Sequence, residues 1–175
     1  MSETMLALVA LMIASFFMFS QQRGLVETER ELASIELEVL ADAVGSEVME
    51  QIAVKAFDAT TIGINPQEAT LMDLTPSVAF GDSLDCPGVC DDIDDFNNMK
   101  PDTVFFELGR DELDEPYGFN FVVTAEVSYV DSEGYRTPNR TWVKEVTLFV
   151  EQAAGASGKK YQRMPIILKQ HFSLQ

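Results

Sequence analysis

Basic side chains and histidine are scarce in this sequence of 175 residues. Twelve lysines and arginines stand against 29 aspartates and glutamates, which gives a formal net charge of −17, and there is one histidine. A strongly acidic surface repels phosphate backbones, so the charge balance argues against binding to nucleic acids. An excess of one sign also keeps a protein soluble and dispersed.

The motifs of common enzyme chemistry are missing as well. The sequence has no glycine-rich phosphate loop, no Ser/His/Asp layout in a plausible pocket and no haem-attachment Cys-x-x-Cys-His. The two cysteines, Cys86 and Cys90, would need two more ligands to form a zinc site, and the only histidine, His171, is distant in sequence. We therefore predict no enzymatic activity and no cofactor.

Proline is absent from the first 57 residues, and charged side chains are absent from residues 4–22. Residues 4–20, TMLALVALMIASFFMFS, are apolar all round. As a helix they would span about 25 Å, at the short end of what a bilayer core needs. We predict one long helix with an apolar membrane or assembly segment at residues 1–23 and an amphipathic continuation at residues 24–57.

The continuation has the spacing of a helix with one buried stripe, because its apolar residues recur mostly at steps of three, four or seven. These residues are Leu25, Leu32, Ile35, Val39, Leu40, Ala43, Val44, Val48, Ile52 and Phe57. The whole helix would reach about 85 Å, so its front part must project from the head. At residues 21–24 the helix either continues or bends and unwinds, since Gly24 costs about 1 kcal/mol relative to alanine.

The rest of the chain predicts a strand-rich head. Residues 58–116 contain five prolines and no sustained periodicity, so we expect them to wrap the head and to add short strands at 71–74, 77–80 and 104–108. Alternation predicts strands at 119–130 and 165–174, and another at 141–152 with Trp142, Val146, Leu148 and Val150 on one side. Residues 117–175 would then form an antiparallel meander covered by the back half of the helix, an α+β fold.

A secretory signal peptide does not account for the apolar segment. The first basic residue is Arg23, so a basic n-region is absent, and no Ala-x-Ala-like cleavage site follows. The N-terminal flank carries the acid Glu3, which also leaves the positive-inside signal missing if the N-terminus lies inside. A leader rich in lysine or arginine, removed before Met1, would supply it, so we expect Met1 to begin a processed protein.

An apolar helix with an acid near its start, followed by a loop region and strands, resembles the mature form of type IV pilin-like subunits, the group of type IV pilins, tight-adherence pilins and pseudopilins. Their pattern usually has Phe or Met first and Glu fifth, whereas this chain has Met1 and Glu3. The resemblance implies removal of a basic leader by a leader peptidase, residence in the inner membrane, and polymerisation by an assembly machinery into an extracellular filament. The residues expected to carry assembly are Met1, Glu3, Leu6, Leu8, Val9, Leu11, Met12, Ile13, Phe16, Phe17 and Phe19.

Two alternatives to a filament-forming structural subunit remain open. One is a minor pilin or pseudopilin that caps or primes a filament, and the other is a monomeric exported binding domain held by an uncleaved signal anchor. Glu3 also has two explanations. An acid in the first turn stabilises the helix dipole by about 0.3–1 kcal/mol without any partner. In a dry environment it needs a partner, and the resemblance implies the amine of a neighbouring copy's Met1.

Two further features lie in the connecting region. Cys86 and Cys90 enclose Pro-Gly, which offers a tight turn, and export would place them where disulfides persist, so we predict a small structural disulfide. Four nearby acids are a weak calcium candidate, because hard cations bind carboxylate oxygens. They are Asp91, Asp92, Asp94 and Asp95. Their spacing does not fit an EF-hand, and we favour a solvated acidic loop.

Overall fold

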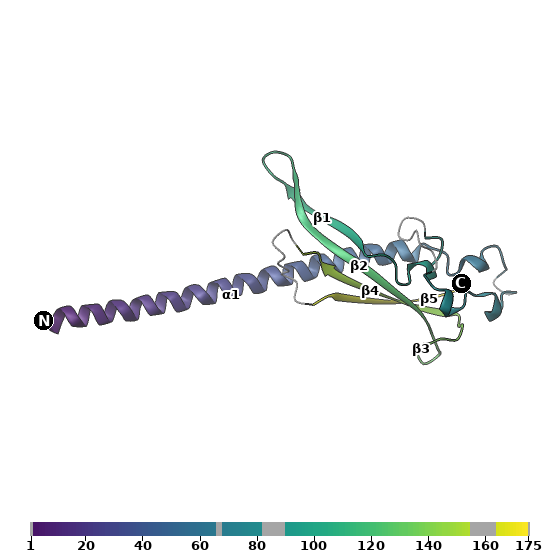
Figure 1. Cartoon of the computed structure of the whole chain (residues 1–175), viewed down its shortest axis with the longest axis horizontal. Coiled ribbons are helices and arrows are strands. Elements are labelled where there is room, and N and C mark those ends of the chain that lie inside the picture. Colours follow the sequence, from purple (N-terminus) through teal and green to yellow (C-terminus); the bar gives the residue numbers. More distant parts are fainter. Residues whose placement is uncertain (1, 66–67, 82–89, 155–163, 175) are drawn as a thin grey trace.

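The computed structural model describes residues 2–65, 68–81, 90–154 and 164–174. Its main feature is one helix, α1 (Ser2–Ala53), whose front half projects from a strand-rich head (Figure 1). The helix runs without interruption through residues 21–24, so the junction neither bends nor unwinds. It ends at Ala53, four residues before the expected end at Phe57.

Between α1 and the sheet the described residues form four short 3₁₀ turns, Ala59–Thr61, Leu71–Asp73, Ser77–Ala79 and Asp94–Phe96. The strands predicted at residues 71–74 and 77–80 are therefore wrong. Thr70 and Asp73 form a capping box around one turn, and Pro76 stands at the start of the other. These residues satisfy the backbone locally, which removes the need for a strand partner.

The sheet is antiparallel, with the strand order β1-β2-β4-β5 and a short β3 paired with the end of β2. The strands are β1 (Asp102–Arg110), β2 (Pro116–Val130), β3 (Arg136–Thr137), β4 (Val143–Gln152) and β5 (Ile166–Ser173). The predicted meander of β2, β4 and β5 is present, and β1 extends it at one edge. A long helix packed on an antiparallel sheet confirms the α+β prediction.

The hairpin of β1 and β2 forms an arm that leaves the body of the sheet. β2 pairs with β4 only between Phe121 and Tyr129, whereas it pairs with β1 as far as Pro116. Among the described residues, the first four residues of β2 therefore pair with β1 alone, since the carbonyl oxygen of Asn120 accepts from the amide of Ala153 at 2.8 Å. Figure 1 shows this arm standing away from both α1 and the rest of the sheet.

The core lies between the back half of α1 and one face of the sheet, chiefly β4 and β5. The helix contributes Leu37, Ala41, Val44, Met49 and Ile52 to it, all buried. Facing residues of the two central strands are Phe121, Val123, Ala125, Val127, Val146, Leu148 and Val150. At Gly45 the helix lies so close that a Cβ atom would be 2.1 Å from Cδ1 of Leu168. A larger residue at this position would therefore require the side chain of Leu168 to move.

The other face of the sheet carries a cluster of charged side chains. Glu145 on β4 accepts from Nε of Arg136 at 2.8 Å and lies 3.5 Å from Nζ of Lys169 and 3.4 Å from Nε2 of His171. Arg136 also pairs with Glu126 at 3.0 Å. The sheet thus has one apolar face under the helix, and an opposite face on which this charged cluster lies beside apolar residues such as Phe149 and Ile167.

Candidate functional site

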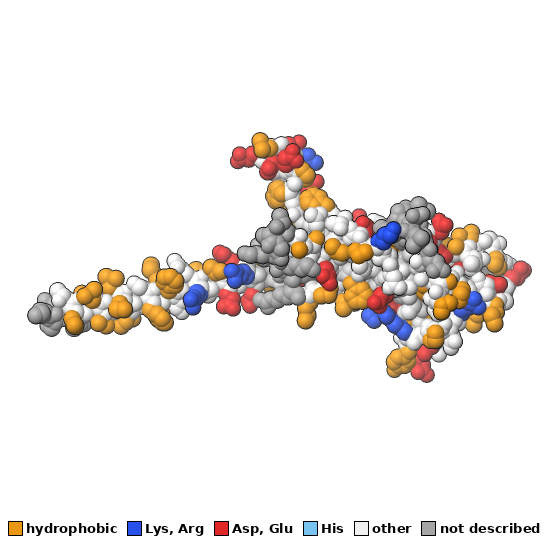
Figure 2. All heavy atoms as spheres, viewed as in Figure 1, with side chains coloured by type: hydrophobic (Ala, Val, Ile, Leu, Met, Phe, Trp, Pro, Cys, Tyr) orange, Lys and Arg blue, Asp and Glu red, His pale blue; other side chains and the backbone are white. Residues whose placement is uncertain are grey.

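The projecting half of α1 is an exposed apolar surface. Eight of the predicted assembly residues have described side chains, and all eight are exposed: Leu8, Val9, Leu11, Met12, Ile13, Phe16, Phe17 and Phe19. Figure 2 shows hydrophobic side chains distributed along this whole length. By length and composition the helix contains a segment able to cross a membrane, a property that signal sequences near an N-terminus share. Exposed apolar surface on this scale exceeds what soluble monomers tolerate.

Three predicted assembly residues have no described side chain. Glu3 and Leu6 lie within α1, but their side chains are outside the described part of the structure, and Met1 is outside it altogether. The pairing of Glu3 with a neighbouring copy therefore stays a prediction.

The predicted buried stripe of α1 separates into two faces. Val44 and Ile52 are buried against the sheet and Phe57 in the head beyond the helix, with Leu40 and Val48 partly buried. Ala43 is exposed, as are the four large residues Leu25, Leu32, Ile35 and Val39, which are 56–65% exposed. At 3.6 residues per turn these four lie on the side opposite Leu37 and Ala41. We call them the outer stripe; the prediction that they belong to a single buried stripe is wrong.

A cluster of charged side chains is buried where α1 meets the connecting region. Lys144, on the face of β4 that carries Val146, has no exposed surface. Its Nζ donates to the carbonyl oxygen of Phe57 at 2.6 Å, to Oδ2 of Asp58 at 3.3 Å and to Oδ1 of Asp94. All three ammonium hydrogens therefore have acceptors.

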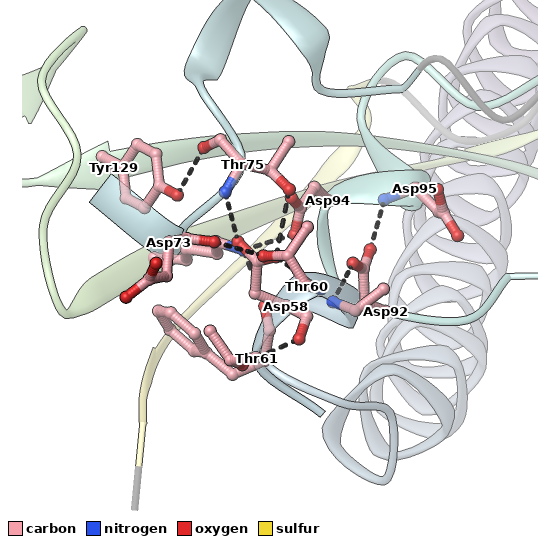
Figure 3. A network of polar contacts seen from close by, with 12 residues as sticks. Asp58, Thr60, Thr61, Asp73, Thr75, Asp92, Asp94, Asp95 and Tyr129 are labelled. Atoms are coloured by element: carbon pink, nitrogen blue, oxygen red, sulfur yellow. Dashed lines mark hydrogen bonds and ion pairs between the residues drawn. The ribbon is translucent and has the colours of Figure 1, made fainter. Parts of the chain in front are cut away.

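Backbone and hydroxyl donors hold the carboxylates of this cluster (Figure 3). Asp58 accepts from the amides of Thr60 at 3.1 Å and Thr75 at 2.7 Å and from both threonine hydroxyls. Asp92 accepts from the amide of Ala59 at 2.5 Å. Within the described residues, Oδ2 of Asp94 has no hydrogen-bond partner. Asp94 is thus the least satisfied of the three acids.

Aromatic rings close the cluster from water. Nζ of Lys144 lies 4.5 Å from the ring centre of Phe57, 5.2 Å from that of Phe80 and 5.5 Å from that of Tyr129. The hydroxyl of Tyr129 donates to the carbonyl oxygen of Thr75 at 2.7 Å. The ammonium therefore combines charge pairing with cation–π contact in a dry site.

The buried acids titrate in different directions. Burial raises the pKa of Asp94 to about 7, although the charge of Lys144 acts to lower it. Burial also raises the pKa of Asp92. For Asp58, burial acts to raise the pKa, but the hydrogen bonds from Thr60 and Thr75 and the charge of Lys144 outweigh it and lower the pKa. Of these three acids, Asp94 is therefore the one that is most readily protonated near neutral pH.

The four acids of the weak calcium candidate do not all lie together in the structure. Asp92 and Asp94 meet Asp58, with one oxygen of each within 4.8 Å of the others, whereas Asp91 is exposed and Asp95 is partly buried at the edge. Oδ2 of Asp95 accepts from the amide of Asp91 at 2.8 Å. Since the ammonium of Lys144 contacts both Asp58 and Asp94, a side chain already supplies the positive charge that this acidic cluster needs.

The structure describes one of the two cysteines of the predicted disulfide. Cys90 is buried and disulfide-bonded, and it belongs to the core cluster. Cys86 lies outside the described residues.

Comparison of the chain with protein-family models, with curated proteins and with solved structures gives no match.

Proposed function

We propose that this chain is a structural subunit of an extracellular helical filament of the type IV pilus kind. In such a filament the α1 helices bundle along the axis and the strand-rich heads lie outside. The observation that carries the proposal is the apolar surface of α1, exposed over the projecting half and continued by the outer stripe beside the head. Before assembly, the same projecting half would hold the subunit in the membrane.

Burial of this surface provides enough free energy for a non-covalent polymer. Burying one Leu, Ile, Phe or Met side chain is worth about 1.5–3 kcal/mol, and each copy exposes many of them. Contacts between copies would be head-to-tail, because a two-fold interface closes after two copies and does not propagate.

The outer stripe favours a filament over a monomeric anchored domain. A membrane core accommodates about 20 helical residues, so a helix that enters it near residue 4 leaves at about residue 24. Leu32, Ile35 and Val39 lie beyond that point, where a monomer would expose them to water. Neighbouring helices in a bundle would cover them.

The test is electron microscopy of cells that produce the full chain together with its assembly machinery. Filaments that label with an antibody to the head are expected, and their absence would contradict the proposal. Glu3→Ala and Glu3→Gln, compared at equal amounts of membrane-inserted subunit, test the pairing of Glu3 separately. Both variants are expected to lower filament yield; wild-type yield from both would remove the pairing and leave the filament in place.

A further inference from the structure

The tip of the β1–β2 arm carries several acids around an exposed apolar residue. Oδ1 of Asp111 accepts from the amides of Leu113 at 2.8 Å and Glu115 at 2.9 Å, so this acid holds the turn together. Arg110 pairs with Glu107 at 3.2 Å and Asp114 at 3.4 Å. Among the described residues no ion pair involves the side chains of Glu112 and Glu115, and between them Leu113 is 83% exposed.

A groove whose lining carries two arginines and one glutamate lies on α1 just in front of the head. It is lined by Phe19, Gln22, Arg23, Val26, Glu27 and Arg30. Arg23 and Arg30 are two helical turns apart and, within the described part of the chain, neither forms an ion pair. Phe19 and Val26 are exposed between and beside them. We call this surface the neck groove.

The neck groove continues the face of α1 that the sheet covers. Steps of three or four residues lead from Arg23 and Arg30 to Leu37 and Ala41, which are buried under β4 and β5. The head therefore covers this face only in its back part. A second head could extend the same cover toward the N-terminus.

The tip and the neck groove of one copy do not meet. Figures 1 and 2 show the arm projecting away from α1, with open space between its acidic end and the helix. A contact between these two surfaces must therefore join two copies, and it would join them head-to-tail, the geometry that propagates.

We propose that the β1–β2 tip of one copy binds the neck groove of the next copy in the filament. Glu112 and Glu115 would pair with Arg23 and Arg30, and Leu113 would lie against Phe19 and Val26. The arginines are about 10.5 Å apart along the helix, a span that two long glutamate side chains on one turn can bridge. This inference rests on the proposed function and names the contact that orders its heads.

Charge complementarity is what favours a second copy as the occupant. The chain has a net charge of −17, so neighbouring heads repel one another in general. The contact places two of the twelve basic residues against two free acids, which relieves repulsion locally and sets the register between copies.

The experiment is a charge swap in the full chain, scored as filament mass pelleted from cells with equal amounts of inserted subunit. The tip variant is Glu112→Lys with Glu115→Lys, and the neck variant is Arg23→Glu with Arg30→Glu. Each alone is expected to lower the filament mass about tenfold or more, because like charges then face each other. The combination of all four changes restores opposite charges and the original net charge, and it is expected to recover assembly.

A matched control uses Glu68→Lys with Glu133→Lys, the same change of charge at two exposed acids elsewhere on the head. Glu133 lies in a turn that Asp131 caps in the way Asp111 caps the tip. This control is expected to assemble normally. Wild-type assembly by the tip and neck variants, or failure of the combination to recover, would overturn the contact while the filament itself stands. Absence of filaments from the wild-type chain would instead overturn the proposed function, and this contact with it.

Discussion

At the scale of single residues, Lys144 departs furthest from its usual environment, since it is a lysine with no exposed surface. It contacts two carboxylates, one carbonyl oxygen and three aromatic rings, which come from the connecting region and from β2. Through these contacts Lys144 links the connecting region and β2 to β4. Such a cluster adds little net stability over an apolar core, but removing one member leaves uncompensated charge.

Lys144→Met tests that dependence. Methionine has a similar length but no charge, so Asp58 and Asp94 would be left buried without a cation. We expect the free energy of unfolding to fall by about 3–5 kcal/mol, measured by denaturant titration of the full chain in detergent micelles. Lys55→Met, at an exposed lysine just after α1, is the control and should change the free energy by less than about 0.5 kcal/mol. Equal effects of the two substitutions would show that the cluster is not needed for stability.

Asp94 gives a prediction about pH. Its pKa is about 7 in the folded chain and has the ordinary value of 3.8 when unfolded, because burial outweighs the attraction of Lys144. The folded state therefore binds more protons between these values, so this group makes the protein less stable as pH rises through that window. The raised pKa of Asp92 acts in the same direction, whereas the lowered pKa of Asp58 adds stability that is lost only as pH falls below its ordinary range.

The measurement is the free energy of unfolding of the wild-type chain and of Asp94→Asn across the window from about pH 4 to about pH 7. The wild-type value, relative to that of the variant, should decline by up to a few kcal/mol with rising pH and level off above about pH 7. Parallel pH profiles of the two proteins would contradict the assignment of the slope to Asp94.

At the scale of elements, the sequence predicts those parts of the fold that rest on regular periodicity. The uncharged residues 4–22 and the absence of proline predict α1, and alternation predicts β2, β4 and β5. The 3₁₀ turns at Leu71–Asp73 and Ser77–Ala79 were not predicted, because three-residue turns have no period and depend on local caps. Which side of α1 is buried was also not predicted correctly, because the helix carries apolar residues on two sides.

The buried cluster was not predicted either, although its sequence contains a signal. The apolar side of β4 was assigned from Trp142, Val146, Leu148 and Val150, and Lys144 occupies the same side by alternation. A lysine on an apolar strand face calls for buried acids. Which acids those are depends on how the connecting region folds over the sheet, and short-range sequence patterns do not determine that.

Two glycines of α1 give opposite predictions. At Gly45 a Cβ atom would overlap with Leu168 and come within 3.0 Å of Val150, whereas at Gly24 no surrounding atom among the described residues lies within 4 Å. Gly45→Ala should therefore lower the free energy of unfolding by about 1–3 kcal/mol through overpacking. The higher helix propensity of alanine would offset part of this loss. Gly24→Ala has only that gain of about 1 kcal/mol, which circular dichroism should show as greater helix content on heating. Stabilisation by both substitutions would mean that the helix does not approach the sheet this closely.

At the scale of the whole molecule, the proposed function would place one helix in two environments in succession. Residues 4–20 of its projecting half are apolar on every side, which would suit lipid before assembly and a helix bundle afterwards. The back half of α1 has one face under the sheet and the outer stripe on the opposite face. Only a helix bundle would cover the outer stripe. In the proposed filament every apolar surface of α1 would be buried. A helix bundle and a simple membrane anchor differ most in whether they cover the outer stripe.

The outer stripe provides the last prediction. Leu25→Ser, Leu32→Ser and Val39→Ser together make this face polar without touching the core or the uncharged residues 4–20 of α1. We expect membrane insertion and head folding to be retained and filament mass to fall about tenfold or more, since each buried Leu or Val contributes about 1.5–3 kcal/mol to its contact. The matched control replaces Val54, Ile62 and Val78 with serine, three apolar residues that are at least 66% exposed on the head. Because a simple anchor uses only the projecting half, filaments formed equally well by both triple variants would mean that helix bundling ends where that half ends, and that the outer stripe faces water.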